Sequence, residues 1–341
     1  MKPTVVISSP VDTYSGYGAR SRDFIKAIID LNKYDVKLLS QRWGNTRFGY
    51  LADHKLDSLS ALTVPSLTNK PDIWIQITVP NEFSPVGNYN IGVTAGIETN
   101  ICHQSWVQGV NKMDVTFTSS EHSKEVFVKT QWELKDNKTG KTELLKVNKP
   151  IEVLFEGVDI TKYFETKSTL DLSTIKETFC FLVVGHWLQG SLGHDRKNIG
   201  YTIKSFLETF KNKPSQPALI LKTSHVTTSL MDKDALLTKI ETIKNTVKGK
   251  LPNIYIVHGD MSDKEVNDLY NHTKVKAMVT HTRGEGFGRP LLEFSMTGKP
   301  IIATGWSGHL DFLNPEYCTI INGTLEKLDN SSVQKNVLLK E

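Results

Sequence analysis

The feature that most constrains the fold of this chain is a regular alternation of two sequence patterns. Apolar runs of strand length, such as TVVISSP (4–10), DIWIQITV (72–79) and FCFLVVG (179–185), alternate with stretches in which apolar residues recur at helical spacing. Strands that alternate with helices along a chain form parallel sheets covered by helices. The sequence therefore predicts an α/β fold.

The alternation runs through the chain twice. Residues 160–176 are polar and weakly periodic, and we interpret them as a linker between domains at 1–165 and 166–341. A length of 341 residues agrees with two domains, since roughly 150 residues per domain is usual. Two similar, doubly wound, Rossmann-like domains facing across a cleft are the simplest account. Ligands of such domains bind at the carboxyl ends of the strands.

Composition excludes several classes of protein. No run approaches the roughly 18 uncharged apolar residues that a membrane-spanning helix needs, and the first apolar run is too short for a secretory signal. Three widely spaced cysteines favour reduced thiols over a disulfide framework. We therefore expect a cytoplasmic protein. The net charge of +4 permits a polyanionic partner without requiring one.

The most informative segment is THTRGEGFGRPLLEFSMTG (280–298). A glycine-rich turn between a buried strand and a helix directs several backbone N–H groups to one place, where the helix start adds positive potential that suits a phosphate. Pro290 falls in the first helical turn, where its missing N–H costs nothing. Glu285 before the helix and Glu293 within it would flank such a ligand. The alternative is a structural turn whose glycines permit tight packing.

This segment resembles the E-x7-E signature of retaining glycosyltransferases with the GT-B fold, close to glycosyltransferase family 4. The resemblance begins upstream at HGDMSDKEV and extends downstream through GKPIIATGWSGHLDFL. It implies that Glu285 is catalytic and lies near the donor sugar, that Glu293 binds the ribose, and that the backbone of Gly286, Phe287 and Gly288 faces the diphosphate. It also implies a nucleotide-sugar donor, such as UDP-glucose, a hexosyl or pentosyl group as cargo, and retention of configuration.

A departing diphosphate gains negative charge, which a metal ion or fixed cations must offset. The segment FLVVGHWLQGSLGHDRKNIGYTIKSF (181–206) resembles the diphosphate-binding segment of the family and supplies Arg196 and Lys197. It departs from the family pattern at His186, where an arginine is usual, and in the extra GSLG. Lys222, at the end of the strand ALILKTS, is a third candidate. The alternative for these residues is a pair of exposed basic side chains at a helix start.

We expect neither a metal ion nor another cofactor. The one D-x-D motif, at 232–234, lies at a predicted helix start, where aspartates cap exposed N–H groups. His258, His281 and His309 lack metal-ligand spacing, and we interpret them as core or loop histidines with ordinary hydrogen-bond partners.

In the first half, the loop SGYG (15–18) joins the first strand to the first helix. By analogy with GT-B enzymes, Gly16 and Gly18 let the backbone approach the donor phosphate or the acceptor; a tight turn is the alternative. Glu98 and Thr99 follow a buried strand at its carboxyl end, where a carboxylate can bond the donor sugar, or orient or deprotonate an acceptor hydroxyl. A helix N-terminal cap is the equal alternative. The segment LFEGVD (154–159) resembles the family's hinge.

The acceptor is the open question. The SGYG-x-x-SR opening and the VPNEF stretch resemble a tailed-phage set of transferases, which makes a hydroxymethylated base in phage DNA one candidate acceptor, in the host cytoplasm. A glycan, lipid or protein acceptor stays open. The Lys-rich segment 129–149 is predicted to be a surface hairpin. It could assist DNA binding through its lysines and Trp132, or simply be solvated.

Two other functions share these sequence features. A GT-B-type sugar-nucleotide epimerase would need acid–base residues around the sugar in place of an acceptor pocket, and a non-catalytic binding module would keep only the nucleotide contacts. The family also usually ends with helices that cross back onto the N-terminal domain. This sequence stops at NVLLKE soon after the last predicted strand, so we expect that crossover to be absent or short.

Overall fold

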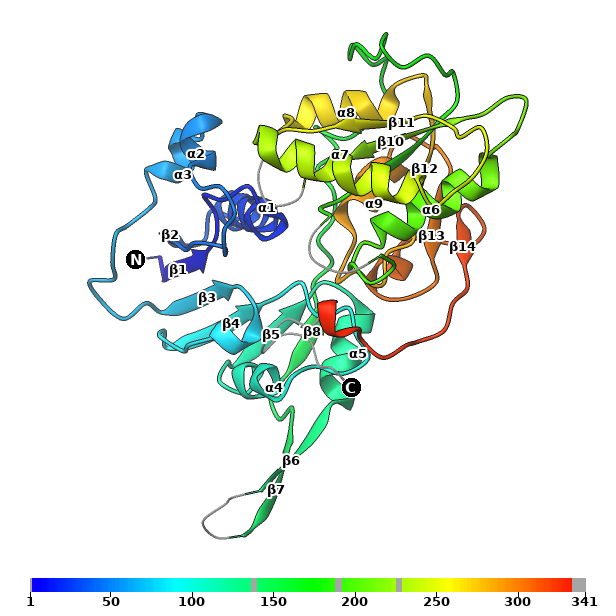
Figure 1. Ribbon diagram of the computed structural model, residues 1–341. Helices are drawn as coiled ribbons and strands as arrows, with labels where there is room; N and C mark the ends of the chain where they lie inside the picture. Colours follow the sequence, from blue (N-terminus) through cyan, green and yellow to red (C-terminus); the bar gives the residue numbers. More distant parts are fainter. Residues whose placement is uncertain (1, 136–139, 188–191, 225–228, 333–341) are drawn as a thin grey trace. The chain divides into compact units, whose positions relative to one another are not determined.

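A computed structural model of the protein describes residues 2–135, 140–187, 192–224 and 229–332. The described chain forms two compact units that divide between Glu156 and Gly157. Each unit is built on its own six-stranded sheet (Figure 1). Every strand pairing within the two sheets is parallel, so the predicted α/β fold with two doubly wound domains is confirmed.

The sheet of the first unit has the strand order β2-β1-β3-β4-β5-β8. Both of its faces are covered: Val5 and Ile7 of β1 pack with Ile25 of α1, whereas Val6 between them packs with Trp74 on the other side. Alternate residues thus enter different cores, as expected for a strand buried on both faces. The bounds are β1 Thr4–Ser9, α1 Gly16–Asp30, β2 Asp35–Ser40, α2 Tyr50–Asp53, α3 Asp57–Ser60, β3 Ile73–Ile77, β4 Tyr89–Val93, α4 Gln104–Val110, β5 Val115–Thr118, α5 Glu121–Lys129, β6 Gln131–Lys135, β7 Thr142–Lys146 and β8 Ile151–Val153.

The sheet of the second unit has the order β11-β10-β9-β12-β13-β14. In β10, Leu219 and Leu221 pack with helices α6 and α7, while Ile220 packs with α8 and α9. The bounds are β9 Cys180–Val184, α6 Ile199–Phe210, β10 Ala218–Lys222, α7 Leu230–Lys244, β11 Ile254–Val257, α8 Asp263–Asn271, β12 Val275–Thr280, α9 Arg289–Ser295, β13 Ile301–Thr304 and β14 Thr319–Ile321.

The order of the second sheet places one special point at its carboxyl edge. The chain builds the sheet outward from β9 in one direction and then returns to add β12 on the other side of β9. Ligands of doubly wound sheets bind at such a switch point, outside the carboxyl ends of the two strands. The loops that leave β9 and β12 are the two that carry Arg196, Lys197 and Glu285.

The segment interpreted as a linker belongs to the second unit. Tyr163, Leu172 and Ile175 are buried in the core of that unit, together with strands β9 and β10. The division at Glu156 and Gly157 consequently precedes the sequence boundary at 165/166. The segment is mostly polar, so its sequence did not indicate that a few apolar side chains anchor it to the core of the second unit.

Several short elements escaped the sequence analysis, namely α2, α3, α4 and β14, which have seven residues or fewer. Too few residues are present in such elements for a period to be read. The predicted surface hairpin is confirmed as the antiparallel pair β6 and β7. The expectation for the C-terminal crossover falls on residues 333–341, outside the described part. None of the helices described here combines the length and the apolar character needed to cross a membrane.

Candidate functional site

Glu285 forms the centre of a polar cluster at the carboxyl edge of the second sheet. Its carboxylate is buried, with Lys197 Nζ 2.5 Å from Oε1 and Arg196 Nη1 3.5 Å from Oε2. Thr282 Oγ1 donates a further hydrogen bond of 2.8 Å to Oε1. The structure therefore brings together the catalytic candidate and two cations that lie 88 and 89 positions away in the sequence.

The charge state of Glu285 follows from these contacts. Burial by itself would raise the pKa of this carboxyl, but Lys197 first and Arg196 second outweigh it and lower the pKa to about 2. The group is therefore ionised at neutral pH. Two cations face one carboxylate, so the cluster retains positive charge that can meet an anionic ligand.

A third predicted cation lies near the same place. Burial, and then the charges of Lys197, Arg196 and Lys222, lower the pKa of His186, whose Nδ1 is 2.9 Å from Ser224 Oγ. The charges of all three cations therefore act on His186, which is itself exposed directly after β9. Lys222 itself donates a 2.5 Å hydrogen bond to the carbonyl of Gly259, and burial lowers its pKa. A ligand anion would have to compete for Lys222 with that carbonyl.

The glycine-rich turn begins helix α9 as the sequence predicts, with Pro290 in the first turn. Gly288 has φ +97°, and a Cβ there would lie 3.0 Å from His309 Cβ, so only glycine fits without strain. The ring of Phe287 is buried and packs on Phe312, 5.2 Å between centroids. The side chain of Phe287 therefore belongs to the core, and a ligand could meet only its backbone. Lys197, Glu285, Gly288 and Pro290 line a small hollow here.

Glu293 belongs to a different cluster from Glu285. It is buried within α9, with Arg289 Nε 3.3 Å from Oε1 and the Tyr270 hydroxyl 3.4 Å from Oε2. Burial raises its pKa to about 7, despite the opposing effect of Arg289. Among the described residues, the hydrogen bonds of the two predicted glutamates share no partner.

The raised pKa of Glu293 predicts a specific pH dependence of stability. Because the folded protein holds this proton more tightly than an ordinary glutamate of pKa 4.5, the free energy of unfolding should fall as the pH rises from 4.5 to 7. The expected decline is on the order of 3 kcal/mol and levels off above neutral pH. Glu293→Gln should remove this component. Urea unfolding of both proteins at acidic and alkaline pH measures the difference, and parallel profiles would contradict the prediction.

The D-x-D motif lies near the start of α7, with Asp232 in the first turn, but the helix is capped by Ser229 rather than by an aspartate. Asp232 instead lies 3.1 Å from His258 Nε2, with both side chains buried. His281 and His309 also have partners, at Thr202 Oγ1 and the Thr304 carbonyl respectively. In the described part of the chain, no three or more His, Cys, Asp or Glu side chains gather to hold a metal ion. Metal independence stays a prediction.

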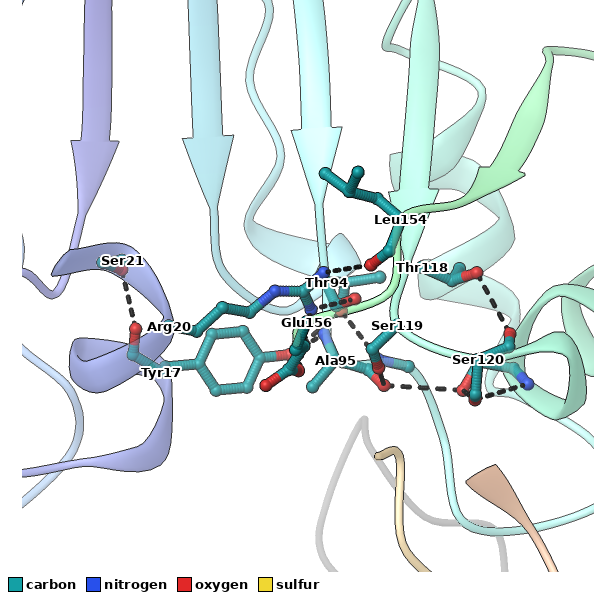
Figure 2. A network of polar contacts seen from close by, with 12 residues as sticks. Tyr17, Arg20, Ser21, Thr94, Ala95, Thr118, Ser119, Ser120, Leu154 and Glu156 are labelled. Carbon is teal, nitrogen blue, oxygen red and sulfur yellow. Dashed lines mark hydrogen bonds and ion pairs between the residues drawn. The ribbon is translucent and has the colours of Figure 1, made fainter. Parts of the chain in front are cut away.

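In the first unit, a polar network fixes the backbone that follows β4 (Figure 2). The Tyr17 hydroxyl accepts a hydrogen bond of 2.9 Å from the Ala95 amide, and Ser119 Oγ donates one of 2.6 Å to the Ala95 carbonyl. Arg20 donates to the Thr94 carbonyl at 2.8 Å and forms a buried ion pair of 3.3 Å with Glu156. Helix α1 and the residues after β5 thus hold the start of the loop that contains Glu98.

Glu98 lies half-buried in that loop. Burial raises the pKa of Tyr17 to about 12, and the charge of Glu98 adds to that rise. The alternative role as a helix cap is wrong, because α4 begins at Gln104 and its cap is His103, whose Nδ1 accepts from the Ser105 amide. Thr99 instead donates to the carbonyl of Ile101. Glu98 thus stays a candidate on the acceptor side.

The two glycines of the SGYG loop have different surroundings within the first turns of α1. A Cβ on Gly18 would lie 2.4 Å from the Thr13 carbonyl oxygen and 2.9 Å from that of Pro10, whereas nothing lies within 4 Å of a Cβ on Gly16. Gly18 is thus explained by packing. Gly16 leaves open space that a ligand can approach.

These surroundings predict different effects of two matched substitutions on the free energy of unfolding. Gly18→Ala should lower the free energy of unfolding by about 1–3 kcal/mol, because the backbone it meets cannot move aside cheaply. Gly16→Ala should change it by less than about 0.5 kcal/mol. Urea unfolding of both variants measures this. Equal destabilisation would contradict the assignment, and lost activity in Gly16→Ala alone would support a ligand beside Gly16.

The sequence analysis did not identify the residues that hydrogen-bond to the backbone and the carboxylate of Glu285. Ser307 Oγ accepts a 2.7 Å hydrogen bond from the Glu285 amide, and the Gly308 amide donates to the Glu285 carbonyl at 2.9 Å. Thr282 contributes the hydroxyl described above. The sequence feature that could have identified them is their position shortly after the strands β12 and β13, whose carboxyl ends lie at the same edge of the sheet.

No protein-family model and no curated protein sequence matches this chain. Among solved structures, it is similar to HepE of Anabaena in complex with UDP and glucose (TM-score 0.54, 15% identity, 92% of this chain and 83% of that chain). It is also similar to trehalose-6-phosphate from E. coli bound with UDP-2-fluoro glucose (0.59, 11%, 94% and 88%) and to sucrose-phosphate synthase from Thermosynechococcus elongatus (0.62, 10%, 94% and 86%). With its two parallel six-stranded sheets, the chain has the fold of the GT-B glycosyltransferases.

Proposed function

We propose that this protein transfers a sugar from a nucleoside-diphosphate sugar to an acceptor hydroxyl. One observation carries the proposal: a buried carboxylate, Glu285, lies against Lys197 and Arg196 at the switch point of a doubly wound sheet. That arrangement offers cations to a diphosphate and a fixed carboxylate to a sugar hydroxyl at one place. Structures of the same fold that hold UDP, UDP-glucose and UDP-2-fluoro glucose support the choice of donor.

In this proposal the protein's own cations offset the charge of the departing diphosphate. Lys197 and Arg196 meet it from one loop, and Lys222 approaches from the end of β10. The backbone of Gly286, Phe287 and Gly288 adds N–H donors. No metal ion is then required, because fixed positive charge replaces it.

The two glutamates have separate roles in the donor complex. Glu285 orients the sugar while it positions Lys197, and Glu293 binds the ribose. The group transferred is proposed to be a hexosyl or pentosyl group, with retention of anomeric configuration. Both details rest on the E-x7-E resemblance.

The first unit supplies the acceptor side. Glu98 is proposed to orient or deprotonate the acceptor hydroxyl, and Gly16 to leave room for the ligand. A hydroxymethylated base in DNA is the proposed acceptor, with the enzyme acting in the cytoplasm of a phage-infected host. Trp132 is partly buried against the core and its Nε1 donates to the Cys102 carbonyl at 3.1 Å, so the proposal gives the contact with DNA to lysines. The exposed lysines of the hairpin β6–β7 remain to contact phosphates.

The test is a donor screen followed by a search for products. Thermal unfolding is measured with UDP-, GDP- and ADP-sugars, and the best donor is then incubated with hydroxymethylated DNA, oligosaccharides, lipids or no acceptor. A shifted midpoint and a mass gain of one sugar on an acceptor support the proposal. Conversion of the donor without an acceptor would identify an epimerase. A failure of every donor to bind would exclude nucleotide-sugar chemistry.

A further inference from the structure

We propose that Arg283 is a positioning residue that holds the loop carrying Arg196 and Lys197 in place for the donor. The inference rests on the proposed function, and it concerns a residue outside the E-x7-E signature. Arg283 follows β12, two residues before Glu285, and its side chain points to the neighbouring loop between β9 and α6.

Two hydrogen bonds join the two loops. Arg283 Nε donates to the Gly193 carbonyl at 3.0 Å, and the Arg283 amide donates to the Arg196 carbonyl at 2.9 Å. Thr282 Oγ1 lies 3.3 Å from that same carbonyl of Arg196. The cation loop is thus fixed at Gly193 and again at Arg196, directly before Lys197. The Arg283 side chain contacts the loop at Gly193, whereas that of Thr282 lies near Arg196.

The segment after β14 closes the other side of Arg283. Glu326 Oε2 lies 3.4 Å from Arg283 Nη2, and Ser332 Oγ donates to the carbonyl of His194. The Arg283 side chain is 26% exposed, whereas that of Glu326 is 64% exposed. An ion pair with so exposed a partner contributes little by itself. Arg283 should therefore act mainly through its contact with Gly193, and Glu326 should assist weakly.

The loop needs such support before Asp195, because its own turn begins only there: the Asn198 amide donates to the Asp195 carbonyl at 2.8 Å and the Ile199 amide donates to Asp195 Oδ2 at 2.9 Å. Gly193 has φ +82°, a conformation that glycine adopts easily but does not enforce. The two cations must meet a diphosphate within a narrow range of positions, and a displacement of about 1 Å can cost on the order of 10²-fold in rate. A guanidinium that links Gly193 to the Glu285 loop keeps the two cations at a fixed position relative to the carboxylate.

Arg283→Met removes the guanidinium and keeps most of the apolar stem. We expect the Kd for UDP to rise about 10-fold, with a larger increase in KM for the donor than decrease in kcat. Amide hydrogen exchange of residues 192–198 should speed up at least 10-fold, while that of the buried strand β10 stays unchanged. Arg283→Lys should recover part of the UDP affinity, because an ammonium can still donate to Gly193. Glu326→Gln should change the Kd less than 3-fold.

Lys213→Met, at an exposed position after α6, is the matched control for the loss of a positive charge. Unchanged exchange of residues 192–198 in Arg283→Met would overturn the inference, as would wild-type UDP affinity. If the wild-type protein fails to bind UDP and every other nucleotide, the proposed function fails. The exchange measurement still decides whether Arg283 supports the loop, so the two failures are distinguishable.

Discussion

Replacing Lys197 by methionine is expected to lower kcat/KM for sugar transfer by at least about 100-fold, the usual effect of removing one preorganised group that stabilises developing negative charge. Lys197 is 13% exposed and lies 2.5 Å from Glu285, so water cannot easily replace it. The substitution also leaves Glu285 buried with only Arg196 as its cationic partner. Steady-state rates with the donor found in the screen, together with UDP affinity by calorimetry, measure the effect.

Two comparisons separate this loss from a general change of charge or folding. Lys213→Met removes an exposed lysine and should leave the rate unchanged within 2-fold. Arg196→Met removes a cation that is 34% exposed and more distant from the carboxylate, so its effect should be smaller, about 10-fold. Wild-type turnover in Lys197→Met, with the fold intact by circular dichroism, would remove Lys197 from the donor site.

Glu285→Gln is expected to separate binding from turnover. A neutral amide no longer competes for Lys197 and Arg196, so UDP should bind as tightly as to the wild-type protein or more tightly. Turnover should fall at least about 100-fold, because the group proposed to orient the sugar has lost its charge. Calorimetry with UDP and single-turnover rates with the donor test the two halves independently.

The same substitution has a distinct signature in acid. The pKa of Glu285 lies near 2 in the folded protein, below its ordinary 4.5. This carboxylate therefore contributes stability that is present above pH 4.5 and is lost as the pH falls towards 2. Glu285→Gln should lack that component, so its acid unfolding should be less steep. Weaker UDP binding together with full turnover would contradict the role assigned to Glu285.

Both predictions follow from the partners that the protein itself gives to its cations. Lys197 and Arg196 are already engaged by Glu285, and Lys222 by the carbonyl of Gly259. A diphosphate must share these cations with the protein's own acceptors. Such pairing keeps buried cations satisfied before the ligand arrives, since an unpaired buried charge is strongly unfavourable.

The sequence alone predicted the parts of the fold that depend on local patterns. Strands such as β9 and β10 are recognisable in the sequence as continuous apolar runs, because both faces of a parallel sheet are buried. The GEGFG turn and Pro290 predict the start of α9 by their backbone preferences. Short elements such as α4 and the attachment of residues 157–176 to the second unit escaped, because they depend on a few long-range apolar contacts.

For the candidate site, the sequence determined which side chains were available and at which ends of strands they would lie. Only the tertiary structure decided their partners. It joined Glu285 to Lys197, placed Glu293 beside Tyr270, packed Trp132 against the core, and set Arg283 against Gly193. The physical reason is that the periodicity of strands and helices in the sequence reports only on the local conformation of a few neighbouring residues. Ion pairs and burial between residues about 90 positions apart exist only once the order of the strands has brought their loops together.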